Sequence, residues 1–286
     1  MKRIAFLSTI LLLLSACGKD RITYLTPVRI SVEGFVISVE DELPQSKDTS
    51  LSQYQAAKAV TLALFNADGM LRYCSTQLRS DSVGYTTFGQ FDFALPMGSY
   101  TMEVFAYGSD SALMVNGRTE AAYTADKVRE TFVATRPLDI TSTDPVTVNA
   151  TLSRITSNLQ VISTDNRTSN ADAVRLTYSA CGKSFNPITG LATVNGGIVN
   201  TVYLTYPAGQ PAKINSYSFL NADQQFVDIG IDVLDTAGGV LTHKEVINVP
   251  LRRNARTVLQ GQLFTTGTSS SFMLDTDYDT VIYVNF

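Results

Sequence analysis

The sequence of 286 residues contains no tryptophan, three cysteines and a single histidine, His243. A Ser-His-Asp triad requires a histidine that is oriented and partly buried. His243 follows the turn-like stretch TAGGVLT and precedes Lys244 and Glu245, a pattern typical of an exposed strand. No Gly-x-Ser-x-Gly motif, the usual setting of a nucleophilic serine, precedes it. We therefore predict that His243 is not catalytic and that the protein is not an enzyme.

The absence of tryptophan bears on glycan binding, because surface proteins that capture glycans usually present aromatic platforms to the sugar rings. The chain has 13 tyrosines and 14 phenylalanines. Most of them fall on the faces of expected strands, where core packing accounts for them. A surface lipoprotein that binds glycans therefore stays an alternative and is not our main interpretation.

The small number of cysteines excludes a zinc site, because no two of them have the spacing that such sites use. Cys74 and Cys181 are far apart in the sequence. We predict two small buried side chains at these positions. A disulfide between them is the alternative in an oxidising compartment.

Motifs for other metals and for cofactors are equally scarce. Asp275, Asp277 and Asp279 are spaced like the first ligands of a calcium loop. An EF-hand would then need glycine and glutamate where the chain has Thr280 and Phe286. We interpret this segment as a solvated acidic turn. No glycine-rich phosphate loop lies between a strand and a helix, and we expect no metal and no cofactor.

Basic residues are too few and too scattered for nucleic acid. The formal net charge is −4, and it becomes −6 without residues 1–16, which contain Lys2 and Arg3 but no acidic residue. The one basic cluster, RRNAR at 252–256, is expected to be a solvated turn between strands. A mildly acidic chain of this kind lacks the electrostatic footprint of a nucleic-acid-binding protein.

Long hydrophobic runs are absent except at the start of the chain. Ile4–Leu14 is too short to span a bilayer, which takes about 20 residues, but it has the length and basic flank of a secretory signal. The following Leu14-Ser15-Ala16-Cys17 resembles the bacterial lipobox, in which the cysteine is acylated and the chain is cut just before it. We expect residues 1–16 to be a cleaved signal peptide and a lipid on Cys17 to anchor the protein. An ordinary cleaved signal is the alternative.

The rest of the sequence predicts strands. Apolar and polar residues alternate in VTLALF at 60–65, FDFAL at 91–95 and YTMEVFAY at 100–107, and most regularly in VDIGIDVLD at 227–235. A period of two indicates a half-buried strand. Turn residues such as NADG at 66–69 separate the strands. In VRISVEGFVIS the apolar phase shifts at Glu33-Gly34, as a β-bulge would cause. The polar segment 40–59 is expected to be an exposed loop.

Short strands at regular spacing favour β-sandwiches, and the length allows two of them. A strand is predicted across 146–163, with a domain boundary near residue 152 in its centre. We therefore expect an N-terminal domain over 17–152 and a C-terminal domain over 153–286.

Several phrases resemble the fimbrillin superfamily of Bacteroidales. They are VPLRRNARTVLQGQLF at 249–264, VTVNATLSRITSNLQVIS at 146–163, ALFNADGMLRY at 63–73 and LPMGSYTMEVFAYG at 95–108. The resemblance implies an all-β protein with two transthyretin-like β-sandwich domains in tandem. It also implies an outer-membrane lipoprotein with a role in adhesive fimbriae, whose partners are other fimbrial subunits and a host or bacterial surface receptor.

The same resemblance separates two roles. Stalk subunits of that superfamily are cut by a protease, often after an arginine, and a neighbour's terminal strand then replaces the first strand; anchor subunits are not cut. The chain has no arginine between Arg29 and Arg72, and the expected loop holds only Lys47 and Lys58. This favours an anchor or accessory subunit over a stalk or tip subunit. The C-terminal TVIYVNF at 280–286 either closes its own sandwich or docks into a neighbour.

Overall fold

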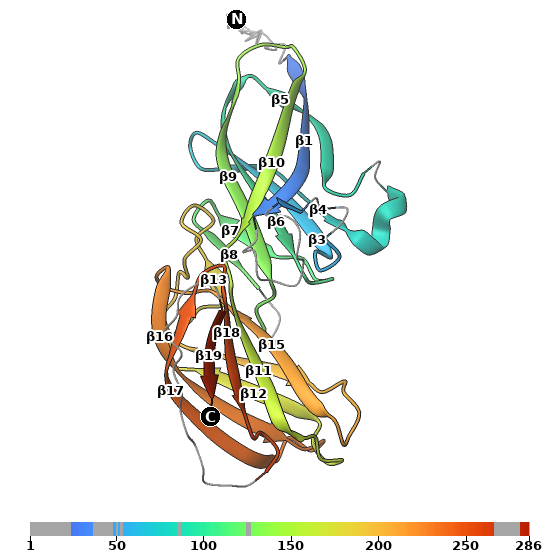
Figure 1. Ribbon diagram of the computed structural model, residues 1–286. Coiled ribbons are helices and arrows are strands. Elements are labelled where there is room, and N and C mark those ends of the chain that lie inside the picture. Colours follow the sequence, from blue (N-terminus) through green and yellow to red (C-terminus); the bar gives the residue numbers. More distant parts are fainter. Residues whose placement is uncertain are drawn as a thin grey trace, which may run out of the picture.

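The protein is described by a computed structural model, which covers residues 24–36, 48–49, 51, 54–84, 87–123, 127–265 and 281–285. The side chains of Val36, residues 48–49, Ser82 and residues 281–285 lie outside this description. Within it the chain is all-β, as predicted, and a short 3-10 helix, η1 (Arg79–Gly84), is the single helical element. The strands form two lobes, drawn one above the other in Figure 1.

Strands β1 to β10 belong to the upper lobe and its lower border (Figure 1). Their bounds are β1 (Leu25–Val36), β2 (Asp48–Thr49), β3 (Ala59–Asn66), β4 (Leu71–Leu78), β5 (Gln90–Pro96), β6 (Gly98–Tyr107), β7 (Met114–Gly117), β8 (Glu120–Ala122), β9 (Thr131–Ile140) and β10 (Val146–Arg154).

Strands β11 to β19 build the lower lobe. Their bounds are β11 (Ser157–Asn166), β12 (Ala173–Tyr178), β13 (Ser184–Phe185), β14 (Ile198–Tyr203), β15 (Pro211–Ser218), β16 (Gln224–Leu234), β17 (Val240–Arg252), β18 (Arg256–Gly261) and β19 (Val281–Asn285).

The upper lobe is a sandwich made from one continuous, folded sheet. Strand β1 pairs with β10 on one edge and with β5 on the other. Strands β9, β6, β3 and β4 form the opposing layer, which joins the first where Ser153 and Arg154 pair with β9. Apolar side chains from both layers fill the space between them, among them Ile30, Leu62 and Val104, and all three are fully buried.

The predicted bulge in β1 is confirmed, since its register with β10 shifts between Val32 and Gly34. Alternation without the bulge would turn Phe35 away from the side that Ile30 occupies. The extra residue restores the inward direction, so that Ile30 and Phe35 are both fully buried while Glu33 is exposed.

The prediction of an exposed loop over 40–59 is wrong for its described C-terminal part. Leu51, Tyr54 and Ala57 are buried in the upper core. The Arg79 guanidinium donates hydrogen bonds to the carbonyl oxygens of all three residues and lies over the ring of Phe88. The polar composition of the segment concealed this packing, because two residues separate each of the three apolar residues from the next.

The lower lobe consists of two four-stranded sheets, β15-β11-β18-β19 and β14-β12-β16-β17. The predicted alternation in β16 is confirmed, because Val227, Ile229, Ile231 and Val233 are all buried. The single strand expected over 146–163 is instead two strands, interrupted at 155–156, where the chain passes from β10 to β11. The two-domain division near residue 152 stays a prediction.

Strands β3 and β6 are buried on both faces, although their patterns predicted half-buried strands. Their second faces pack against a cluster that continues into the lower lobe. Within it Phe105 contacts Phe185 at 6.0 Å between ring centroids, and Tyr123 stacks on Phe219 at 6.2 Å. Strand β13 of the lower lobe also pairs with β8, so the lobes share a three-stranded sheet.

Candidate functional site

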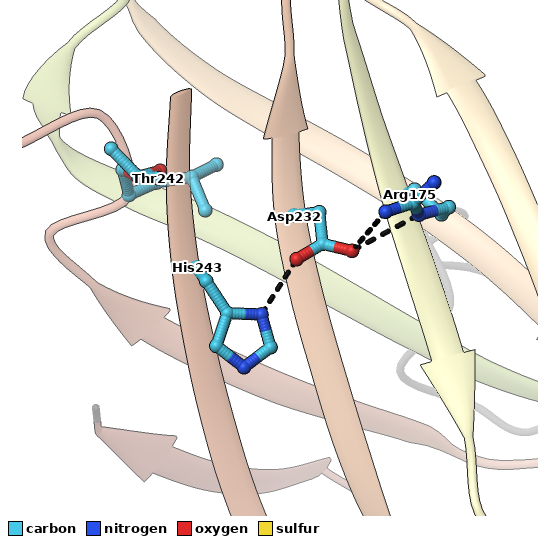
Figure 2. Close-up of polar contacts among 5 residues, drawn as sticks. Arg175, Asp232, Thr242 and His243 are labelled. Carbon is cyan, nitrogen blue, oxygen red and sulfur yellow. Dashed lines mark hydrogen bonds and ion pairs between the residues drawn. The ribbon is translucent and has the colours of Figure 1, made fainter. Parts of the chain in front are cut away.

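The single histidine belongs to a polar row on the outer face of the lower lobe. Arg175 of β12, Asp232 of β16 and His243 of β17 are direct neighbours across three adjacent strands. The Arg175 Nη2 donates to Asp232 Oδ2 at 2.7 Å, and His243 Nδ1 lies 2.6 Å from Asp232 Oδ1 (Figure 2). Asp232 thus bridges a cation on one side and the imidazole on the other.

This row has a carboxylate and an imidazole but lacks a nucleophile among the described contacts. Thr242, the hydroxyl next to His243 in sequence, donates to the carbonyl oxygen of Leu263 and so is engaged elsewhere. Burial raises the pKa of Asp232, but hydrogen bonds from His243 and Arg175 outweigh it and the pKa is lowered. The His243 side chain is 60% exposed, as expected. The row is an ion-pair ladder of a sheet surface and not an assembled catalytic site.

Sequence reasoning placed His243 correctly but missed both partners. The alternation in β16 assigns Asp232 to the outer face, yet a period of two does not say which residue lies opposite on a neighbouring strand. That information resides in the register, which the turn Thr236–Gly239 and the shift between Val233 and Leu234 set.

The first strand is the most extensive candidate for an interaction between subunits. Residues 28–36 of β1 pair with β10 and residues 25–31 pair with β5, so the strand is paired along both edges, with both neighbours at residues 28–31. Val28, Ile30, Val32 and Phe35 point into the core and are at most 9% exposed. Removing β1 would leave two strand edges unpaired and open a long apolar groove, which are the conditions for strand addition by another chain.

The last described strand, β19, lies at the edge of its sheet and pairs in parallel with β18, from Arg256 opposite Val281 to Gln260 opposite Asn285. The C-terminal strand is therefore paired within its own chain in this structure. The segment that follows β18 is fixed by Asp165, whose carboxylate accepts hydrogen bonds from the amides of Leu263 and Phe264 and from the Thr265 hydroxyl.

The remaining predicted residues divide into two groups. Cys17, with its expected lipid, and the carboxylates Asp275, Asp277 and Asp279 lie outside the described residues. Cys74 and Cys181 are both free. The prediction of a buried side chain is confirmed for Cys181 and wrong for Cys74, which is exposed on β4. Burial raises the pKa of the Cys181 thiol to about 11, which leaves it unreactive near neutral pH.

The basic cluster at 252–256 is a turn between β17 and β18, as predicted. Arg253 in this turn also makes contacts within the protein. It pairs with Asp223 at 2.6 Å and donates to the carbonyl oxygen of Thr189 at 2.7 Å. The cluster therefore fastens neighbouring loops of the lower lobe together.

The two most exposed aromatic side chains on the described surface of the lower lobe, Tyr203 and Phe226, do not form a common platform. Tyr203 of β14 is 70% exposed and lies in the row of Ala173 and Leu234. Phe226, 62% exposed, is eight residues from Leu234 along β16, about 27 Å at the rise of a strand. Stacking of a glycan across both rings is excluded by this separation.

Together these features define an all-β sandwich protein with extended strand pairing, and the described part contains no helix long and apolar enough to cross a membrane. Residues 97–285 match the model of a family of unknown function, DUF6562, and the chain belongs to this family. A comparison with curated proteins found no match.

Solved structures with a similar fold come from Bacteroidales. A candidate adhesin from Bacteroides ovatus is 13% identical, with a TM-score of 0.51 and 77% of each chain covered. A candidate polysaccharide-binding protein (DUF1812) from Bacteroides thetaiotaomicron is 12% identical, with a TM-score of 0.50 and coverage of 78% of this chain and 80% of that one. The fimbrial anchor protein Mfa2 from Porphyromonas gingivalis is 12% identical over 79% of this chain and 83% of its own, with a TM-score of 0.42. The predicted resemblance to fimbrillin-type proteins is confirmed as a likeness of fold.

Proposed function

We propose that the protein is a cell-surface fimbrial subunit, anchored in the outer membrane by a lipid on Cys17, that joins neighbouring subunits by strand complementation and takes part in adhesion. The anchor or accessory role is our preferred one. The observation that carries the proposal is the position of β1, a first strand that fills an apolar groove between β10 and β5 and begins eight residues after Cys17.

The distribution of arginines supports an anchor over a stalk. A protease that cuts after arginine finds no site between Arg29, which lies within β1, and Arg72, which lies within β4. Lys58 is exposed beside Asp110, at 3.1 Å, so cleavage after lysine is the route by which a stalk subunit would arise. In that case β1 leaves and a neighbour's strand fills the groove.

The N-terminal residue of the mature protein on cells tests the proposal. An anchor should begin at Cys17 and carry fatty acid, whereas a stalk subunit should begin after Lys47 or Lys58. A chain that begins at either lysine would overturn the anchor role while leaving the fimbrial role intact.

Substituting Cys17→Ala should abolish labelling with radioactive fatty acid and release or mislocalise the protein. Cys74→Ala is the matched control, because Cys74 is an exposed thiol of the folded body and should not affect labelling. Equal labelling of the Cys17→Ala protein and the unaltered protein would refute lipid attachment at this residue.

A further inference from the structure

Exposed apolar side chains lie at the end of the upper lobe that points away from the lower lobe. Strand β1 begins at this end, at the top of Figure 1. Leu25, the first residue of β1, pairs with Pro96 at the end of β5, and Met97 forms the turn from β5 to β6. Tyr24, Leu25 and Met97 are between 52% and 60% exposed, although leucine and methionine side chains are mostly buried in folded proteins.

The hairpin of β3 and β4 adds two more apolar side chains to the same end. Tyr100 connects the two groups, because its hydroxyl donates to the Pro96 carbonyl oxygen at 3.0 Å while its backbone pairs with Asn66. The amide of Met70 donates to Asn66 Oδ1 at 2.8 Å. Met70 and the following Leu71 are about half exposed. We call these two residues, together with Tyr24, Leu25 and Met97, the apolar end.

The path of the chain indicates what the apolar end faces. Tyr24 is seven residues after Cys17, and seven residues span at most about 25 Å even when fully extended. A lipid on Cys17 therefore holds the apolar end within that distance of the bilayer. A short tether also raises the effective concentration of a contact into the millimolar range. Even a contact that is weak on its own would then be populated.

The side chains of the apolar end suit the boundary between water and hydrocarbon. Tyrosine is enriched at this boundary, because its ring is apolar and its hydroxyl is polar. Charged residues of both signs lie nearby, among them Asp68 in the hairpin and Arg72 on β4. Asp144 belongs to the loop after β9, which Thr26 contacts through the carbonyl oxygen of Ser142. The apolar side chains, rather than a single sign of charge, therefore have to provide the contact.

We propose that the apolar end contacts the bilayer in which the lipid on Cys17 is inserted, so that the upper lobe rests on the membrane. This inference rests on the proposed lipid anchor. The exposed side chains enter the boundary between the headgroups and the acyl chains, and the start of β1 lies at the membrane surface. The lower lobe then projects from the membrane, where other subunits can reach it.

A single tryptophan tests this contact, because the chain has none of its own. Leu25→Trp reports from the apolar end, and Phe226→Trp, at an exposed position of the lower lobe, is the matched control. The chain that begins at Cys17 and carries Cys74→Ala is joined through the Cys17 thiol to a maleimide lipid in phosphatidylcholine vesicles. The Cys181 thiol does not compete for the maleimide, because it is buried.

Vesicles with brominated acyl chains quench a tryptophan that contacts the acyl region. The emission of Leu25→Trp should shift to shorter wavelength and fall by about half or more in these vesicles, as for a tryptophan at a membrane interface. The emission of Phe226→Trp should not change. Equal quenching at both positions, or quenching at neither, would overturn the proposal. A shift to shorter wavelength without quenching would also contradict it and would indicate contact with a second copy of the chain.

Further variants separate the apolar end from the tether. Met70→Glu combined with Met97→Glu places two charges in the proposed contact and should abolish the quenching of Leu25→Trp. Val240→Glu, at an exposed position of the lower lobe, is the matched control and should leave the quenching unchanged. If the double variant does not fold, each single variant should still reduce the quenching. Full quenching in the folded variants would show that the tether alone brings residue 25 to the bilayer, and would reject the contact.

The chemical tether makes this test independent of acylation in cells. Failure of fatty acid to label Cys17 in cells would refute the proposed anchor, whereas the vesicle experiment would still report whether the apolar end contacts a bilayer. Conversely, labelling of Cys17 in cells together with absent quenching in vesicles would refute the contact and leave the lipid anchor in place.

Discussion

Glu103 of β6 lies at the junction between the lobes with its side chain fully buried. Neither of its carboxylate oxygens has a hydrogen-bond partner among the described residues. Desolvation raises the pKa of Glu103 to about 8, against a smaller lowering by Arg118. The residue therefore enters the fold as a neutral acid, because a buried unpaired carboxylate would be far more costly.

This raised pKa predicts how stability depends on pH. The folded state holds the Glu103 proton more tightly than the unfolded state, where the ordinary value of 4.5 applies. Its contribution to the free energy of unfolding is complete below about pH 4.5 and is lost as the pH rises towards 8, at about 1.4 kcal/mol per unit of difference. Glu103→Gln should remove this loss, so urea unfolding at pH 8.5 should find the variant more stable than the unaltered protein.

The matched control is Glu33→Gln, because Glu33 is exposed on β1. It should keep the original slope of stability against pH. A Glu103→Gln protein with an unchanged slope between pH 5 and 8.5 would show that Glu103 ionises normally in the fold.

Substitutions in the row of Arg175, Asp232 and His243 should lower the free energy of unfolding slightly, whereas Glu103→Gln should raise it at high pH. His243→Ala should change the free energy of unfolding by no more than about 0.5 kcal/mol, since the imidazole is largely exposed. Asp232→Asn should cost about 1 kcal/mol at pH 7, because it weakens contacts to both Arg175 and His243. The pKa of Asp232 is lowered, so this difference should be present above about pH 4 and vanish as the pH falls through the lowered value. A loss of several kcal/mol in His243→Ala would contradict the structural interpretation of the row.

The positions of most strands were predictable from the sequence, but the burial of their second faces by other elements was not. Alternation located β5, β6 and β16, and the turn signal NADG located the hairpin of β3 and β4, where Gly69 adopts a φ of 77°. Burial on the second faces of β3 and β6 depends on contacts with the lower lobe, which lie more than 50 residues away in sequence. The apolar residues shift from even positions, which end at Leu152, to odd positions, which start at Ile155. The break between β10 and β11 escaped because a β-bulge within one strand causes the same shift of phase.

The candidate sites follow the same division. The exposure of His243 comes from local pattern. Its contact with Asp232, and the contact of Asp232 with Arg175, depend on the register of β12, β16 and β17, which no local pattern states.

Strand β19 carries a prediction of its own. Deleting residues 280–286 removes five register pairs with β18 and exposes that strand's edge. The truncated monomer should melt about 5 °C lower or more, because 1 kcal/mol corresponds to about 2–4 °C in a protein of this size. A thermal scan of the purified monomer measures this.

The same truncated protein can be tested for incorporation into fimbriae. Normal melting together with failed incorporation would contradict the pairing with β18 as the main role of the strand and favour donation to a neighbour. Normal melting together with normal incorporation would contradict both roles, pairing within the chain and donation to a neighbour.

For the whole molecule, the shared aromatic cluster predicts that both lobes unfold together. Phe185 is fully buried, lies 4.4 Å from Phe219 between ring centroids, and belongs to the strand that pairs with β8. Calorimetry of the unaltered protein should find one transition. Phe185→Ala should cost about 3–5 kcal/mol and separate the transition into two.

Phe226→Ala provides the control, because Phe226 is an exposed phenylalanine of the lower lobe and its removal should leave the single transition in place. Two transitions in the unaltered protein would show that the cluster does not couple the lobes.

The pairing of β1 has a mechanical consequence. A pull applied at Tyr24, on the side of Cys17, acts along the axis of β1, whose hydrogen bonds to β10 and β5 run across that axis. All of these bonds then bear the load at the same time, instead of opening one after another as in a peeled strand. If the proposed anchor role holds, tension between Cys17 and a neighbouring subunit would load β1 in this way, and the strand would resist extraction.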